Sequence, residues 1–141
     1  KKLPDALPAD RESVFYLNVI DIPRVPENVQ GMNTLQLAIK SRIKLFVRPQ
    51  AIKSEAGHAI DKVSLTAAGR AFRIVNRSPF FITLAGIDDR RGRRMLAESL
   101  MIAPFSDATG KTLAPASKAQ AYSLIYVDDL GAYKHHDLIA Q

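Results

Sequence analysis

Hydrophobic and polar residues alternate along Asn33–Pro49, which reads N-T-L-Q-L-A-I-K-S-R-I-K-L-F-V-R-P. A repeat of two residues indicates a β-strand, because successive side chains of a strand point to opposite faces. The segment ends at Arg48-Pro49, since proline lacks the amide hydrogen that a strand ladder needs and holds the preceding residue extended. We expect this strand to present one row of aliphatic side chains: Leu35, Leu37, Ile39, Ile43, Leu45 and Val47.

A second strand is predicted just before this one. Ser13–Ile22 (S-V-F-Y-L-N-V-I-D-I) is rich in β-branched and aromatic residues and shows no helical period. Pro23 and Pro26 end it. The connection Pro23–Met32 contains proline, asparagine, glutamine and glycine, which is typical of a loop of moderate length.

Shorter strand-like segments recur beyond Pro49 and are separated by turn residues. The turns are Ala-Gly, Asn-Arg-Ser-Pro, Asp-Asp-Arg-Arg-Gly and Asp-Ala-Thr-Gly. Short strands about 8 to 12 residues apart, with turn residues between them, favour an antiparallel sandwich. The predicted strands are Lys62–Thr66, Arg70–Val75, Phe80–Ile87, Met95–Ile102 and Ala119–Val127.

The predicted fold class is all-β, with an immunoglobulin-like β-sandwich. Residues 50–141 are long enough to form a complete sandwich domain. Residues 1–49 hold only two predicted strands, which cannot form an independent fold. We therefore interpret residues 50–141 as a complete domain and residues 1–49 as a piece of another domain.

Composition narrows the possible functions. The chain has 141 residues, of which 47% are hydrophobic, and no apolar run reaches the roughly 18 residues that a membrane-spanning helix needs, so we expect no membrane insertion. It has no cysteine, which excludes disulfides, thiolate zinc sites and cysteine nucleophiles. The net charge of +6 favours an anionic partner, but charge alone does not indicate nucleic acid, which we do not expect to be bound.

Residues with potential catalytic or metal-binding chemistry do not form a recognisable site. The neighbours His135 and His136 are expected to point to opposite sides of a strand, and a zinc site needs three or four ligands. Asp88-Asp89 and Asp128-Asp129 are not expected to act as catalytic pairs, because neighbouring residues on a strand or turn rarely converge on one bond. We interpret them as turn residues. We predict no enzyme activity, no cofactor and no metal.

A cluster of arginines, Arg90–Arg94, leaves one alternative function open. It lies at a predicted hairpin tip and has no aromatic residues interleaved with it, so a solvated turn is the favoured interpretation. The alternative is a basic immunoglobulin-like module that binds an anionic partner through this turn.

Long segments of the chain resemble a known family. Leu7–Pro23, Asn33–Pro49, Asn76–Leu84 (N-R-S-P-F-F-I-T-L) and Tyr126–Ala132 (Y-V-D-D-L-G-A) are similar, in the same order, to segments of the periplasmic pilus chaperones of the chaperone-usher pathway. The short connection and the absence of cysteine resemble the short-loop branch of that family. The resemblance implies two immunoglobulin-like domains, with residues 1–49 as the C-terminal part of the N-terminal domain and residues 50–141 as the C-terminal domain. It also implies a periplasmic, non-enzymatic chaperone that caps pilus subunits and delivers them to an outer-membrane usher.

The resemblance also implies roles for seven residues. In that family the last strand of the first domain completes the fold of a pilus subunit, which is called donor-strand complementation. Leu35, Leu37 and Ile39 would be the inserted side chains, and Lys44 would anchor the carboxylate at the subunit's C-terminus. Three charged residues would link the two domains: Glu12, Arg48 and Asp129.

One departure from the family pattern is expected to matter. Family members begin with further strands, one of which carries an arginine that assists the residue matched by Lys44. The chain starts just before the penultimate strand of that domain, so we expect a fragment or processed form. The remaining strands would come from a separate N-terminal polypeptide or from a swapped partner chain.

Overall fold

The computed structural model describes residues 6–22 and 38–141. Contacts between backbone positions divide the chain into two compact units. One unit is Ser13–Val47, and the other combines Lys1–Glu12 with Arg48–Gln141. The described part of the first unit is a two-stranded antiparallel ribbon of β1 (Ser13–Asp21) and β2 (Ile39–Val47).

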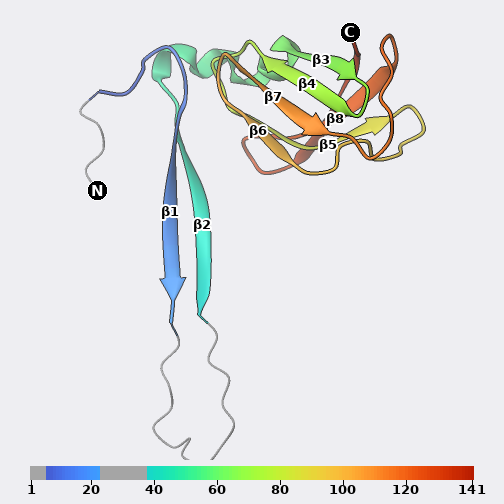
Figure 1. Ribbon diagram of the computed structural model, residues 1–141. Helices are drawn as coiled ribbons and strands as arrows, with labels where there is room; N and C mark the ends of the chain where they lie inside the picture. The colour runs from blue at the N-terminus through green and yellow to red at the C-terminus, as the bar shows by residue number, and fades with distance from the viewer. Residues whose placement is uncertain (1–5, 23–37) are drawn as a thin grey trace, which may run out of the picture. The chain divides into compact units, whose positions relative to one another are not determined.

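The second unit is a β-sandwich, so the predicted all-β, immunoglobulin-like fold is confirmed. Figure 1 shows its strands in two layers, one a 3-stranded sheet in the order β3-β4-β7 and the other a 4-stranded sheet in the order β6-β5-β8-β9. Every pairing in both sheets is antiparallel. The strands are β3 (Val63–Ala68), β4 (Ala71–Asn76), β5 (Ile82–Asp89), β6 (Leu100–Ile102), β7 (Ser106–Lys111), β8 (Ala121–Val127) and β9 (Tyr133–Ile139).

The sandwich core forms because alternate residues of its strands are apolar and point inward. In β3 every second side chain is buried, as expected for a strand with one face against a second sheet, and β5 follows the same alternation except at Gly86 and Ile87, where its register shifts. Phe72 of β4 meets Tyr122 of β8 edge to face, with ring centroids 4.9 Å apart, and so joins the two layers. The Tyr122 hydroxyl accepts a hydrogen bond of 2.9 Å from the backbone N–H of Ser117.

A buried asparagine organises the turn between β4 and β5. Asn76 is fully buried, and its amide nitrogen donates to the carbonyl oxygens of Phe80 at 2.7 Å and Ala103 at 3.0 Å. Its amide oxygen accepts from the backbone N–H of Ser78 at 2.9 Å and from the Ser78 hydroxyl at 2.7 Å. The turn that carries Phe80 and Phe81 is therefore fixed from inside the sandwich.

Two 3₁₀ helices precede β3, namely η1 (Gln50–His58) and η2 (Ile60–Lys62). The sequence predicted neither helix. The interpretation of Asp-Ala-Thr-Gly as a turn was wrong, because Asp107–Gly110 lies within β7. Strand β9 was also missed. Both strands are largely exposed, so their polar residues give no alternating hydrophobic signal.

Candidate functional site

The β1–β2 ribbon separates its side chains into two chemically different faces. Residues paired directly across an antiparallel ladder share a face, and Tyr16 pairs with Lys44 while Leu17 pairs with Ile43. We call the face that holds Val14, Tyr16, Asn18, Ile20, Lys40, Arg42, Lys44 and Phe46 the basic face. We call the face that holds Ser13, Phe15, Leu17, Val19, Asp21, Ile39, Ser41, Ile43, Leu45 and Val47 the apolar face.

The predicted subunit-binding residues fall on this ribbon or just before its described part. Leu35 and Leu37 lie outside the described residues. Ile39 begins β2 on the apolar face and is 62% exposed. Lys44 lies on the basic face and is also exposed. The two therefore point to opposite sides of one strand.

One edge of β2 pairs with β1, and within the described ribbon the other edge has no strand beside it. Such an edge presents a row of backbone N–H and C=O groups that an added strand can bind. The adjoining apolar face exposes large side chains: Leu17 48%, Val19 45%, Ile39 62%, Ile43 48% and Leu45 48%. An open edge beside exposed aliphatic side chains suits strand addition.

The three charged residues predicted to act together do meet, within the sandwich unit. The Arg48 guanidinium donates from Nε to Glu12 at 2.7 Å, and from Nη1 and Nη2 to the two carboxylate oxygens of Asp129 at 2.5 and 2.7 Å. Glu12 directly precedes β1 and Arg48 directly follows β2. Asp129 lies in the turn between β8 and β9.

Glu12 is the buried member of this cluster, with a side chain only 3% exposed. Its second carboxylate oxygen accepts a hydrogen bond of 2.8 Å from the backbone N–H of Phe81, and its own N–H donates to the carbonyl of Pro79 at 2.9 Å. The guanidinium of Arg48 lies over the ring of Phe80, 5.1 Å from its centroid. The backbone contact at Phe81 was not predicted, because a carboxylate that binds a main-chain amide leaves no pattern in the sequence.

The charges of the cluster reinforce one another. The hydrogen bonds from Arg48 lower the pKa of Asp129. The hydrogen bonds from Arg48 to Asp129, together with the one to Glu12, raise the already high pKa of Arg48 further, although partial burial of the guanidinium acts to lower it. The guanidinium is therefore a permanent cation that holds two carboxylates in place.

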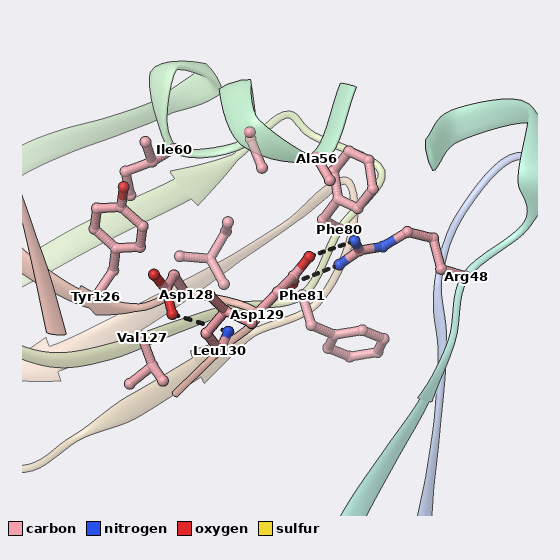
Figure 2. A pocket seen from close by; sticks show the side chains of 13 residues that line it. Arg48, Ala56, Ile60, Phe80, Phe81, Tyr126, Val127, Asp128, Asp129 and Leu130 are labelled. Carbon is pink, nitrogen blue, oxygen red and sulfur yellow. Dashed lines mark hydrogen bonds and ion pairs between the residues drawn. The ribbon is translucent and has the colours of Figure 1, made fainter. Parts of the chain in front are cut away.

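A hollow of about 250 Å³ adjoins this cluster. Figure 2 shows the Arg48 guanidinium pointing at the Asp129 carboxylate, with Phe80 and Phe81 nearby. One carboxylate of the hollow is engaged by the backbone, since Asp128 accepts the N–H groups of Leu130 and Ala132. The three charged residues that line the hollow, Arg48, Asp128 and Asp129, are therefore all bound to other protein groups.

The arginine turn after β5 is partly neutralised from within. Asp89 binds Arg93 at 3.0 Å, and Asp88 binds Arg94 at 2.8 Å. Asp89 also accepts two backbone N–H groups of this turn, which lower its pKa. These carboxylates, the last two residues of β5, thus shape the turn and offset two of its positive charges.

The described residues offer no preformed metal site. No group of three or more histidine, cysteine, aspartate or glutamate residues within 6–22 and 38–141 is placed to hold an ion. His135 approaches the hydroxyl of Ser123 at 3.4 Å, whereas His136 approaches Asp61 at 3.7 Å. In the same ranges, no helix is long and apolar enough to cross a membrane.

Comparison with known families gives two matches that together cover most of the chain. Residues 2–53 match the model described as pili and flagellar-assembly chaperone, PapD N-terminal domain. Residues 58–138 match the model of the pili assembly chaperone PapD, C-terminal domain.

Individual relatives agree with these matches. The probable fimbrial chaperone YadV of Escherichia coli is 37% identical over 135 residues, which cover 89% of this chain and 55% of the relative. The chaperone protein MrkB of Klebsiella pneumoniae is 33% identical over 128 residues, covering 89% of this chain and 54% of the relative. The chain thus spans about half the length of the curated relatives it matches.

Solved structures agree in fold. The crystal structure of the YadV chaperone aligns with a TM-score of 0.75 and 30% identity, covering 95% of this chain and 65% of that structure. The Pseudomonas aeruginosa CupB2 chaperone aligns with a TM-score of 0.74 and 28% identity, covering 99% of this chain and 63% of that structure.

Proposed function

Because the chain belongs to the family of PapD-like pilus-assembly chaperones, we propose that it is a periplasmic chaperone that binds pilus subunits through strand β2. The chaperone caps an incomplete subunit by adding β2 to its sheet and then delivers the subunit to an outer-membrane usher. It needs no cofactor and no nucleotide, because folding of the subunit on the donated strand supplies the free energy.

The observation that carries this proposal is the open edge of β2 beside the apolar face. Main-chain groups of the edge bind the guest strand, and alternate side chains enter the guest's core. Ile39 is one such side chain, and the alternating sequence before it predicts the same role for Leu35 and Leu37. Each is worth about 1.5 to 3 kcal/mol when fully buried. Three such side chains therefore supply a substantial part of the binding free energy.

Lys44 has a different role because it faces the other way. Its ammonium group lies five residues beyond Ile39 on the basic face. In the proposed complex it binds the carboxylate at the C-terminus of the subunit and so sets the register of the added strand. A one-residue slip would turn every apolar side chain of the guest to the wrong face, so a fixed register is needed.

Glu12, Arg48 and Asp129 are proposed to link the two domains. The residues that flank the ribbon in sequence, Glu12 and Arg48, bind each other and Asp129. In this role the cluster ties together the two chain segments that lead into β1 and out of β2. None of the three residues lies on β2, so we expect their loss to weaken the chaperone without changing which subunit it binds.

Co-purification with a pilus subunit tests the proposal. The chain is co-expressed with a tagged subunit, and recovery of the complex is compared for Ile39→Asp and Ile139→Asp. The control residue suits the comparison because Ile139 is 65% exposed and Ile39 is 62% exposed. We expect Ile39→Asp and Leu37→Asp to abolish recovery and Ile139→Asp to leave it unchanged.

The anchoring role is tested in the same experiment with a second pair of variants. Lys44→Ala should abolish recovery, whereas Lys111→Ala, which removes an exposed lysine from β7, should not. Undiminished recovery with both Leu37→Asp and Lys44→Ala would rule out the mechanism.

A further inference from the structure

The basic face of the ribbon carries a cation at three of the four positions that β2 contributes to it. Lys40, Arg42 and Lys44 are all exposed and alternate with residues of the apolar face. A strand rises about 3.4 Å per residue, so neighbouring cations of this row lie about 6.8 Å apart along the strand. None of the eight residues on the basic face is a carboxylic acid. The row therefore has no internal counter-charge on its own face.

Arg42 is held in place without losing its hydrogen-bonding capacity. Its guanidinium lies over the ring of Tyr16, 3.9 Å from the ring centroid. Stacking uses the flat side of the guanidinium and leaves its N–H donors, which lie in the plane, available to a carboxylate. Arg42 is therefore oriented on the strand surface, which reduces the entropy lost when an anion binds.

The open edge of β2 determines where an anion would sit. A strand added at this edge would place alternate side chains on the basic face, directly beside Lys40, Arg42 and Lys44. Opposite charges in such cross-strand positions attract, and like charges repel. The intervening side chains of the added strand would lie on the apolar face, beside Ile39 and Ile43.

We propose that the basic face selects the partner strand, favouring an extended protein segment in which acidic residues alternate with apolar ones. This inference rests on the proposed function, because it uses the same open edge. Lys44 is assigned above to a terminal carboxylate. Lys40 and Arg42 are the residues that would read acidic side chains within the segment, and they act as specificity determinants.

The observations favour a peptide over a polyanion such as a nucleic acid. A polyanion would use the cations alone and leave the apolar face exposed. An alternating peptide strand satisfies the cations, the open backbone edge and the apolar face together, because its side chains repeat with the period of β2.

Labelled peptides test the inference by fluorescence anisotropy. Three 12-residue peptides carry leucine at alternate positions and glutamate, glutamine or lysine at the others. For the unmodified chain we expect the glutamate peptide to bind about two- to thirtyfold more tightly than the glutamine peptide, from two cross-strand charge pairs. The difference should shrink as salt is added, because both pairs are exposed.

Charge-reversal variants supply the matched comparison. Lys40→Glu/Arg42→Glu should reverse the preference so that the lysine peptide binds more tightly than the glutamate peptide. Lys118→Glu/Arg90→Glu makes the same change in net charge at exposed residues of the sandwich and should keep the original order. Lys40→Gln/Arg42→Gln, a milder change, should abolish the preference without reversing it.

The outcomes separate this inference from the proposed function. Equal binding of the glutamate and glutamine peptides would overturn the inference and leave strand addition standing. Loss of preference in the control variant, or tighter binding of a 12-nucleotide oligothymidylate than of the glutamate peptide, would also overturn it. No binding of any peptide would overturn both.

Discussion

Arg48 binds the carboxylate of Asp129 with both terminal nitrogens of its guanidinium, at 2.5 and 2.7 Å, although 81 residues separate the two in sequence. This geometry matches the planar guanidinium to the planar carboxylate and is the stronger form of an ion pair. The third nitrogen of the same guanidinium binds Glu12. One arginine thus joins the turn after β8 to the residue before β1.

Removing charge at the two carboxylates should have unequal effects on stability. Glu12→Gln leaves a buried amide where a carboxylate accepts from both Arg48 and the Phe81 N–H, and should cost about 1.5 to 3 kcal/mol. Asp129→Asn should cost at most about 1 kcal/mol, because that side chain is 64% exposed. Unfolding in urea measures both.

Glu55→Gln is the control for this comparison, because Glu55 forms an exposed ion pair with Lys62. Its free energy of unfolding should stay close to that of the unmodified chain. A cost for Asp129→Asn as large as that for Glu12→Gln would contradict the assignment of Glu12 as the principal member of the cluster.

Acid should weaken the sandwich through aspartates whose pKa is lowered in the folded state. Hydrogen bonds from Arg48 lower the pKa of Asp129, and those from Arg73 lower the pKa of Asp107. A carboxyl group with a lowered folded pKa adds stability above its unfolded pKa of about 3.9 and loses it as the pH falls through the folded pKa.

The free energy of unfolding should therefore be nearly constant between about pH 5 and pH 7 and should fall below about pH 4. Asp107→Asn and Asp129→Asn should each make that fall shallower, in both cases to a degree limited by solvent screening. Urea titrations at a series of pH values would show this. An identical acid dependence in both variants and the unmodified chain would exclude these pairs as its source.

The sequence predicted strands best where β-branched and aromatic residues are concentrated. It placed Ser13–Ile22 where β1 covers Ser13–Asp21, and Ala119–Val127 where β8 covers Ala121–Val127. It placed Met95–Ile102 where β6 covers only Leu100–Ile102, because Met95 and Leu96 are buried outside that strand. An apolar residue looks the same in the sequence whether it is buried in a strand or in a loop, so the sequence could not locate the start of β6.

The candidate site was predictable only in part. The alternation of apolar residues was enough to predict the aliphatic row of β2. The contact between Arg48 and Asp129 could not be predicted in this way, because the two residues are 81 positions apart and a local sequence pattern does not extend that far. Only the family resemblance suggested it. The row of cations on the basic face could be recognised only from the pairing register of β1 and β2, which shows that Lys40 and Arg42 lie on the same face as Tyr16.

Loss of the Asn76 amide should destabilise the sandwich strongly. Asn76→Ala leaves the carbonyls of Phe80 and Ala103 and the N–H of Ser78 without their buried partner. An unsatisfied buried polar group costs about 1 to 3 kcal/mol, so the total should reach at least about 2 kcal/mol. Asn18→Ala, at an exposed position of β1, should change stability by less than about 0.5 kcal/mol. Urea unfolding followed by circular dichroism would distinguish the two, and equal effects would refute the role of Asn76.

The apolar face should make the unliganded chain self-associate. Leu45 is 48% exposed there, close to other large aliphatic side chains, whereas Leu113 is 57% exposed on the sandwich. A contiguous apolar patch beside an open strand edge favours association with another chain, but an isolated exposed leucine does not. Leu45→Lys should therefore shift sedimentation toward the monomer, and Leu113→Lys should leave it unchanged. If both variants sediment as the unmodified chain does, the apolar face is not the surface through which the chain associates.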